Sequence, residues 1–352
     1  MGGKSFKFTL GASGENALYK GPVNAVTLVE GLDKGETGDS GSGVYKVSHS
    51  AIAAGSSATG SDIPAVTDYR YYGASPNNYI CLDMEGQSNC PDKHLYRIIG
   101  SIYEEKENTN RIKVIKATPL TDGTISGFSW DCTSSGTYTN IWATITSGNY
   151  SNNLTSGSTL MKLLNSGLWW NGTSGSYYYN RGSATTIEQT INFANYKLSD
   201  NAKSYITTSR YYLGERGTVT VANQWYVYER GTNRSGSNPL YWDGMVGLMY
   251  SSDYGYAAGN TCVTGTSLAN YDDSCKKKDW LWMPNIDNYS NAYEWLMSPF
   301  SDDYSFGISN DGEVSYALDV SAPNTVRPVF YLKSDISITD GDGTSSAPYI
   351  LS

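Results

Sequence analysis

The chain has 352 residues, 39% of them hydrophobic, so it is long enough to bury a sizeable core in one large domain or two ordinary ones. It carries 25 basic and 34 acidic side chains, a formal net charge of −9. Nucleic-acid backbones and anionic membrane surfaces both require a basic partner, so the sequence argues against either. No run of about eighteen apolar residues is present, and we predict no membrane span and no direct membrane contact.

The first 40 residues are expected to form an N-terminal arm and a flexible linker. Within them, Ala25–Glu30 is apolar enough for a strand or one helical turn, and Gly31–Gly43 is acidic and rich in glycine. We place the domain boundary there, so that residues 41–352 form one domain with large insertions. The opening sequence lacks the apolar core of a signal peptide, and an export segment is expected to lie outside this sequence.

The best hairpin in the chain is predicted at Leu95–Tyr103 and Arg111–Lys116, because two β-branched, alternating runs flank a polar bend. Helical spacing of leucines predicts a helix over Ser158–Leu168, with Ser158 as its cap and Gly167 near its end. A shorter capped helix is predicted within Leu198–Ile206. Other strands are predicted at Val44–Ser48, Asp68–Gly73, Tyr79–Met84, Arg210–Gly214, Thr218–Val221, Trp225–Glu229, Leu240–Tyr250, Glu294–Met297 and Val326–Leu332. Phe128–Trp130 and Ile141–Thr144 carry aromatic and β-branched residues amid polar loops.

These elements predict an α+β fold of short, mostly antiparallel strands, one or two helices and long loops. Ser251–Tyr256 is interpreted as a turn. Long loops without regular structure usually serve a function or are held by disulfides.

Five cysteines occur, and two pairs of them are close in sequence. Cys81 and Cys90 bracket eight residues, and Cys262 and Cys275 bracket twelve. Neither spacing is that of a zinc site, whereas two local disulfides with Cys132 left over fit an extracellular or cell-surface protein. The alternative is five reduced thiols in a cytosolic protein.

Other chemical signals are weak. The only histidines, His49 and His94, stand in no catalytic pattern, so a triad or a His-rich metal centre is not expected. The run Asp340–Gly343 resembles half of a calcium loop but lacks the closing glutamate, which favours a turn. We expect no cofactor, while a structural calcium ion is left open.

Two side-chain groups leave alternatives open. Asp302, Asp303, Asp311 and Glu313 suit either a hard cation or catalytic carboxylates, although solvated surface acids fit such a polar loop better. The cluster of Trp169, Trp170 and Tyr177–Tyr179 suits either stacking on sugars or packing in the core.

The stretch Asp279–Lys333 combines apolar ends with a polar centre. Trp280, Trp282, Trp295, Leu296 and Met297 precede the centre, and Val326, Val329, Phe330, Tyr331 and Leu332 follow it. Between them, only Phe300, Phe306, Ile308, Val314, Leu318 and Val320 are predicted to face inward. A rigid apolar frame around a polar, tyrosine-containing insert is typical of a binding surface, and an ordinary long hairpin is the alternative.

An ordered set of motifs carries a family resemblance over residues 41–352. The motifs are DYRYYGASPNNYICL, LYRIIG with NRIKVIK, TLMKLLNSG, SDYGYA, CKKKDWLW, WLMSPF and VRPVFYL with GDGTSSAPYIL. Together they resemble gut-bacterial surface proteins with a C-type-lectin-like domain, related in fold to formylglycine-generating enzymes. Members of this family often follow a pilin-like or signal-anchor N-terminus. Some relatives of the fold are variable proteins of diversity-generating retroelements, whose C-terminal stretch is diversified into a ligand-binding face.

The resemblance implies a surface-displayed, adhesin-like protein that recognises a protein or a glycan on another cell or host. The frame would be WLMSPF and VRPVFYL, and the binding face would lie between Asp302 and Asn324. The candidate ligand contacts are Asn288, Tyr289, Tyr293, Asp302, Asp303, Tyr304, Ser305, Ser309, Asn310, Glu313, Ser315, Tyr316, Asp319, Ser321 and Asn324.

Two other functions remain as alternatives. One is a structural pilus or coat subunit. The other is an enzyme, either an oxidase of the related fold or a glycosidase that uses paired aspartates. The enzymes of this fold use two C-terminal cysteines, and no cysteine follows Cys275 here, so we do not carry that activity over.

Overall fold

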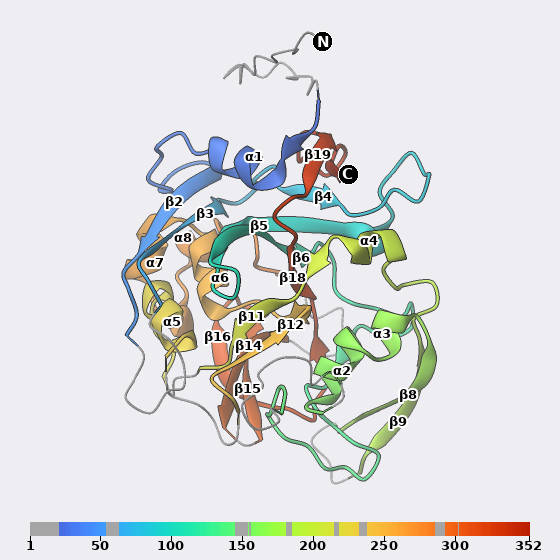
Figure 1. Cartoon of the computed structure of the whole chain (residues 1–352). Helices are drawn as coiled ribbons and strands as arrows, with labels where there is room; N and C mark the ends of the chain where they lie inside the picture. Colours follow the sequence, from blue (N-terminus) through green and yellow to red (C-terminus); the bar gives the residue numbers. More distant parts are fainter. Residues whose placement is uncertain are drawn as a thin grey trace.

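The computed structural model describes residues 21–53, 63–144, 154, 156–180, 185–214, 218–231, 238–285, 293–301 and 303–352, without the side chain of Tyr316. Strands dominate, and several short helices pack around them (Figure 1).

The largest sheet has eleven strands and fills the upper part of Figure 1. They are β1 (Val23–Asn24), β2 (Gly43–His49), β3 (Val66–Tyr72), β4 (Tyr79–Cys81), β5 (Leu95–Glu104), β6 (Thr109–Lys116), β10 (Ile206–Thr207), β13 (Val246–Gly247), β18 (Val329–Leu332), β19 (Ser337–Asp340) and β20 (Tyr349–Leu351). The main path runs β1-β19-β20-β4-β5-β6-β18-β10, while β13 joins β18, and β2 joins β3, which pairs with β5. The predicted hairpin is confirmed as β5–β6.

A second sheet has five strands in the order β16-β15-β14-β17-β7. They are β7 (Gly127–Phe128), β14 (Tyr293–Ser301), β15 (Tyr304–Ser309), β16 (Val314–Asp319) and β17 (Asn324–Thr325). Two smaller pairs are β8 (Ser174–Tyr179) with β9 (Ile187–Asn192), and β11 (Ser209–Tyr212) with β12 (Tyr241–Gly244). Within the described ranges the pairings are antiparallel except β20 with β4 and β14 with β17, which confirms a mostly antiparallel α+β protein. A C-type-lectin-like topology stays a prediction.

The helices are short. They are α1 (Ala25–Gly31), α2 (Thr159–Asn165), α3 (Leu168–Asn171), α4 (Asp200–Ser204), α5 (Ala222–Glu229), α6 (Ser251–Ala257), α7 (Asn260–Gly265) and α8 (Asp273–Lys276), with 3₁₀ turns η1 (Asp92–His94) and η2 (Leu268–Asn270). None of the described helices has the length and apolar character needed to cross a bilayer. For α2, which was predicted over Ser158–Leu168, the N-cap is confirmed, since the Ser158 side chain accepts a hydrogen bond from the Met161 amide. The helix ends at Asn165, two residues before the predicted Gly167.

The expectation of one or two helices is wrong. Residues 225–229 were predicted as a strand and 251–256 as a turn, but both lie in helices, α5 and α6. In α5 the buried residues Ala222, Trp225, Tyr226 and Glu229 recur at helical spacing. The aromatic content of this segment suggested a strand, while the spacing of the side chains favoured a helix.

Part of the expected N-terminal arm packs on the domain. Val23 of β1 pairs with Ile338 of β19, and the side chain of Asn24 caps α1 through the Thr27 amide. Ala25 and Val29, one helical turn apart, are 1% and 0% exposed. Within residues 21–31, β1 therefore belongs to the large sheet and α1 packs beside it.

Both predicted disulfides, Cys81–Cys90 and Cys262–Cys275, are present, and Cys132 is a buried free cysteine. Each loop closure contributes about 2–3 kcal/mol in the chain-entropy view. The pair of disulfides indicates an oxidising, extracellular environment.

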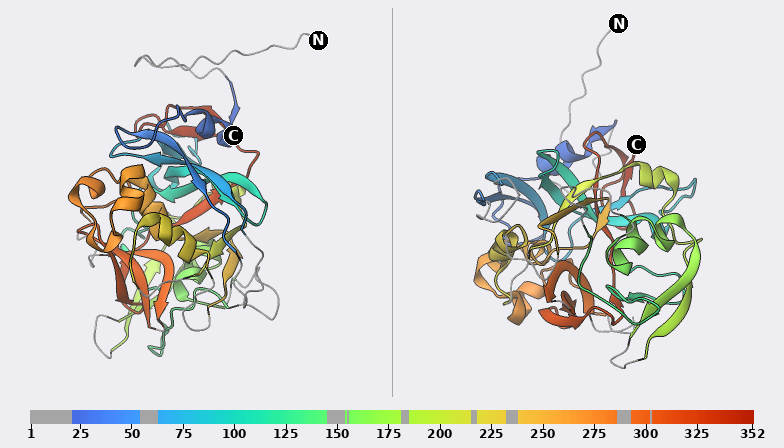
Figure 2. Two further views of the ribbon diagram at one scale, coloured as in Figure 1. Left: turned by 90° about the vertical axis from the view of Figure 1, so that its left-hand side faces the viewer. Right: turned by 60° about the horizontal axis from the view of Figure 1, so that its bottom comes forward.

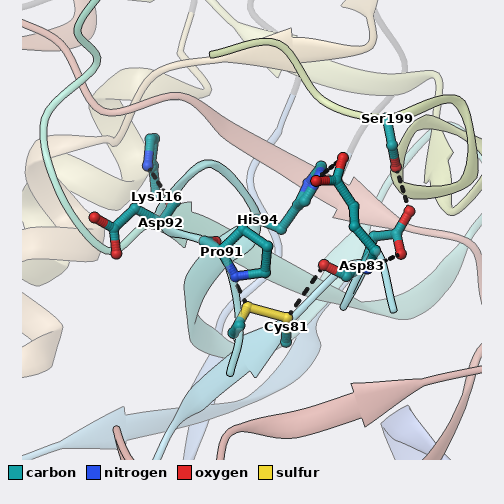
Figure 3. The surroundings of a disulfide bond; sticks show 9 residues. Cys81, Asp83, Pro91, Asp92, His94, Lys116 and Ser199 are labelled. Atoms are coloured by element: carbon teal, nitrogen blue, oxygen red, sulfur yellow. Dashed lines mark hydrogen bonds and ion pairs between the residues drawn. A yellow bond between two sulfur atoms is a disulfide. The ribbon is translucent and has the colours of Figure 1, made fainter. Parts of the chain in front are cut away.

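Polar contacts hold the loop around the Cys81–Cys90 disulfide in place (Figure 3). Asp83 accepts a hydrogen bond from Ser199 of the segment before α4, and Lys116 of β6 donates to the Asp92 carbonyl oxygen at 2.7 Å. His94 contacts the Glu85 carboxylate at 3.2 Å. The loop is thereby joined to β6, the second strand after it, and to the distant α4 region.

A buried charge network connects the large sheet to α6. Arg70 of β3 bonds Asp68 at 2.7 Å and Asp253 of α6 at 3.0 Å, and Lys113 of β6 also contacts Asp253. His49 of β2 lies 2.9 Å from Asp68. Burial alone would raise the pKa of Asp68, but Arg70 and His49 together hold it below its ordinary value. Since buried charges are tolerated only when paired, these contacts fix α6 on the sheet.

A neighbouring buried cluster centres on Arg230 at the end of α5. Its guanidinium lies 3.6 Å from the centre of the Tyr226 ring and 3.3 Å from the Glu105 carboxylate. Glu229 accepts hydrogen bonds from the amide and hydroxyl groups of Ser252 in α6. Burial raises the pKa of Glu229 to about 7, although Arg230 and the Ser252 bonds oppose the rise.

We predict that Glu229 makes the protein less stable as the pH rises. An unfolded glutamate ionises near its ordinary pKa of 4.5, whereas folded Glu229 keeps its proton until about pH 7. The contribution of Glu229 to the free energy of unfolding is fully present below pH 4.5, and it is about 3 kcal/mol smaller at neutral pH. In urea unfolding, Glu229→Gln should therefore gain stability relative to the native chain between pH 4.5 and 7.5. A stability difference that does not change over this range would contradict the assignment.

Candidate functional site

The polar insert between the apolar frame segments forms the β15–β16 hairpin. The hairpin lies at the end of the molecule opposite the C-terminus (Figures 1 and 2). It is the outer edge of the five-stranded sheet, and β14 of the frame lies beside it.

The inward face of the hairpin is apolar, as predicted. Phe306, Ile308, Val314, Leu318 and Val320 are each at most 9% exposed. Phe306 packs edge-on against Trp225 of α5, with ring centres 4.9 Å apart. Most of the frame is buried as well, and Trp295 is fully buried with its indole N–H donating to the Phe128 carbonyl oxygen at 2.7 Å. The prediction of an apolar frame with inward residues is confirmed except at Trp282 and Phe300, which are half-buried.

Three side chains hold the turn of the hairpin by its backbone. They donate to consecutive carbonyl oxygens: Trp282 Nε1 to Asn310 at 3.0 Å, Lys276 Nζ to Asp311 at 3.0 Å and Tyr254 Oη to Gly312 at 2.8 Å. None of these three bonds involves a side chain of the turn. These three bonds therefore position the turn through its backbone.

The outward side of the hairpin is acidic and carries an exposed aromatic ring. Asp303, Tyr304, Asp311 and Glu313 are exposed, with Tyr304 at 39%. Tyr293, Ser309, Asn310, Ser315 and Asp319 are half-buried. The Ser321 amide and hydroxyl donate to the Asp319 carboxylate at 2.9 and 2.7 Å, which orients this acid.

Three predicted contact residues are buried, which corrects their assignment to the exposed face. Ser305, Ser321 and Asn324 are 0%, 1% and 4% exposed. Ser305 bonds the Ser298 carbonyl oxygen of β14, and Asn324 pairs in register with Phe128 of β7. Residues 305–308 of β15 are all buried, and Ser305 supports the hairpin through its bond to β14 instead of facing solvent. Asn288, Tyr289, Asp302 and the Tyr316 side chain lie outside the described residues.

The structure adds one residue, Tyr138, from a loop far away in sequence. It is 38% exposed, and the charge of Asp319, followed by partial burial and the charge of Asp303, raises its pKa. The charge of Tyr304 also raises the pKa of Tyr138, so these groups lie near one another on one surface. No local pattern marked Tyr138, because it lies in a Thr-, Ser- and Gly-rich stretch and approaches the hairpin only through the fold. Asp311 and Glu313 lie at the turn, the other end of the hairpin from the Tyr304–Asp319 pair. We call Tyr138, Asp303, Tyr304 and Asp319 the outer face.

The hairpin contains a β-bulge with an unusual backbone conformation. Ser305 pairs with Leu318 and Gly307 with Ser315, so two residues of β16 oppose one of β15. One of the two, Ala317, has a φ of +64° in the left-handed region. Bulges of this kind twist an edge strand and redirect its side chains.

A buried ion pair joins the parts of the frame beneath the hairpin. Arg327 binds Glu294 of β14 through two hydrogen bonds of 2.7 and 2.8 Å, and it also donates to the Leu281 carbonyl oxygen at 2.7 Å. Both side chains are at most 3% exposed. Glu294 is in register with Ile308 of the hairpin. The pair therefore sets the position of β14 relative to the segment that precedes β18.

The remaining candidates from the sequence divide into turns and core. In the Asp340–Gly343 run, Gly341 and Gly343 have φ of +87° and +80°, as in a tight turn. Trp169 and Tyr177 are buried, and Trp170, Tyr178 and Tyr179 are half-buried, so this cluster is partly core. In the part of the chain that the structure describes, no three His, Cys, Asp or Glu side chains are grouped to hold a metal ion.

Comparison of the chain with protein-family models, curated proteins and solved structures returned no match.

Removing one member of the buried ion pair should destabilise the protein strongly. Arg327→Met leaves the Glu294 carboxylate buried without its partner, which typically costs about 3–5 kcal/mol. Urea unfolding followed by tryptophan fluorescence measures the loss. Replacing both members with methionine should recover much of it, and a double variant no more stable than Arg327→Met would contradict this account.

Relieving the left-handed residue should have the opposite effect. Ala317→Gly removes the steric cost of a positive φ and should stabilise the protein by about 1 kcal/mol, seen as a higher unfolding midpoint. Ala74, also exposed but without a positive φ, is the matched control, and Ala74→Gly should give no gain. Equal effects of the two substitutions would show that the bulge carries no strain.

Proposed function

We propose that this chain is a cell-surface ligand-binding protein whose outer face recognises a protein or a glycan on another cell or host. The carrying observation is the backbone-directed support of the hairpin turn. Donors from Trp282, Lys276 and Tyr254 hold carbonyl oxygens, so outward side chains are not needed for this packing. Such side chains are available for recognition.

The chemistry of the outer face supports the same proposal. Among the described residues the exposed large hydrophobic side chains are Tyr138, Tyr304 and Val227, and the two tyrosines share the outer face. Tyrosines surrounded by polar groups are favoured binding anchors, and carboxylates such as Asp303 and Asp319 add directional hydrogen-bond acceptors. The two disulfides fit display in an oxidising space.

The support of the turn also suits sequence diversification. In the variable proteins that this chain resembles, many residues change on one scaffold. Here positions 310 and 311 are held by their carbonyl oxygens, whereas Phe306 and Ile308 fill the core. We propose that close relatives differ at outward positions of the hairpin and keep the inward ones.

The proposal is tested by removing the exposed rings. Cells or glycan arrays probed with the protein should identify a partner, and Tyr304→Ala and Tyr138→Ala should each weaken its binding at least tenfold, because an anchor ring contributes about 2 kcal/mol. Val227→Ala, which removes an exposed apolar side chain on α5, is the control and should leave binding unchanged. Full binding by a folded Tyr138→Ala/Tyr304→Ala variant would refute the proposal.

A further inference from the structure

Three loops that are distant in sequence meet at the end of the molecule opposite the outer face. They are segment 32–44 between α1 and β2, segment 71–77 at the end of β3, and the turn between β19 and β20. In Figure 1 these elements lie near the C-terminus. They enclose a groove of about 500 Å³, within the range of roughly 300–1,000 Å³ found for small-molecule sites. The outer face makes no use of this groove.

The base of the groove is aromatic. Tyr71, Tyr72 and Tyr349 line it and are 3%, 4% and 7% exposed. Val44 and Pro76 complete the apolar part. Only a small part of each ring reaches the groove, so the tyrosines form a fixed floor with little apolar contact area of their own.

The rim of the groove is polar and only weakly charged. Asn77 contributes an amide, Glu36 and Asp342 contribute carboxylates, and Lys34 contributes an ammonium group. The serine hydroxyls and glycine backbone of segment 40–43 form the rest of this rim. Two carboxylates against one ammonium group disfavour an anionic ligand, while the amide and hydroxyl groups suit a ligand with many hydroxyls.

The walls are held together before any ligand binds. The Ser42 hydroxyl accepts from the Ser75 amide at 3.1 Å, and the Tyr72 hydroxyl donates to the Ser40 carbonyl oxygen at 3.1 Å. On the other side, a Cβ at Gly343 would lie 2.4 Å from the Asn77 carbonyl oxygen, so the turn after β19 requires a glycine to approach segment 71–77. A preformed groove loses little conformational entropy on binding.

We infer that this groove is a second binding site, for a neutral saccharide. The hydroxyls of a sugar exchange hydrogen bonds with the amide, hydroxyl and carboxylate groups at the rim, and its C–H groups contact the small exposed parts of the tyrosines. The same arrangement assigns a role to the Gly31–Gly43 and Asp340–Gly343 stretches, which form two of the walls. This site is separate from the outer face and does not depend on what the outer face binds.

The test uses the whole chain and defined sugars. Saturation-transfer NMR with cellobiose, lactose, mannobiose and N,N′-diacetylchitobiose should give a signal for at least one of them, and digalacturonic acid should give none. A sedimentation assay with purified cell-envelope polysaccharide tests whether the groove binds the sugar as part of a polymer. The NMR experiment tests whether it binds the free sugar. Asn77→Trp fills the groove and should abolish binding, and Asn77→Ala should weaken it about fivefold through loss of one hydrogen bond.

Controls separate this site from general effects. Thr264→Trp adds an indole to an exposed position of α7 outside the groove and should bind sugar like the native chain. Tyr304→Ala should also retain sugar binding, so the two sites fail independently. The inference is overturned if no neutral sugar binds in either form, if only the anionic sugar binds, or if Asn77→Trp binds as well as Thr264→Trp.

Discussion

The buried ion pair between Glu294 and Arg327 is the constraint on which the outer face depends. Both charges lie in the core, where each is tolerated only with its partner in place. Arg327 also reaches the Leu281 carbonyl oxygen, so it joins the three parts of the frame: the segment after α8, β14 and the chain leading to β18. Glu294 pairs in register with Ile308 of β15, so the ion pair with Arg327 also fixes the position of the hairpin.

In the β15–β16 hairpin, the side chains that pack in the core are different from those that face solvent. Apolar side chains such as Phe306 and Val314 face the core, and frame donors hold the turn by carbonyl oxygens. A carbonyl oxygen is present whatever the side chain at that position is. These three bonds to the turn therefore do not depend on its side chains, which suits a surface that serves recognition.

The sequence predicted much of this arrangement, and its failures have physical causes. Alternation over 306–320 predicted the inward face correctly because one side of an edge hairpin packs on a core. The short spacing of the cysteine pairs predicted the disulfides. Helix α5 was missed because its aromatic residues resemble those of strands, and α6 was missed because its Ser, Asp and Gly residues are typical of a turn.

The other failures concern contacts made at long range. Tyr138 reaches the hairpin from more than 160 positions away, and Arg327 and Glu294 are 33 positions apart, so no local pattern contains either contact. Ser305 and Ser321 illustrate the reverse error. Their polar side chains suggested exposure, but buried hydroxyls with partners are stable in a core.

The sequence contains thirty tyrosines, and many of those that the structure describes are buried, several of them beside cations. Arg230 lies over Tyr226, Arg70 over Tyr256 and Lys113 over Tyr250, at 3.6, 4.6 and 4.5 Å. An aromatic face partly replaces the water that a buried cation loses, which explains how this core holds so many charges. Composition alone is therefore a weak argument for binding. The functional argument rests on position, because Tyr138 and Tyr304 are exposed together beside Asp303 and Asp319 while most other described rings serve the core.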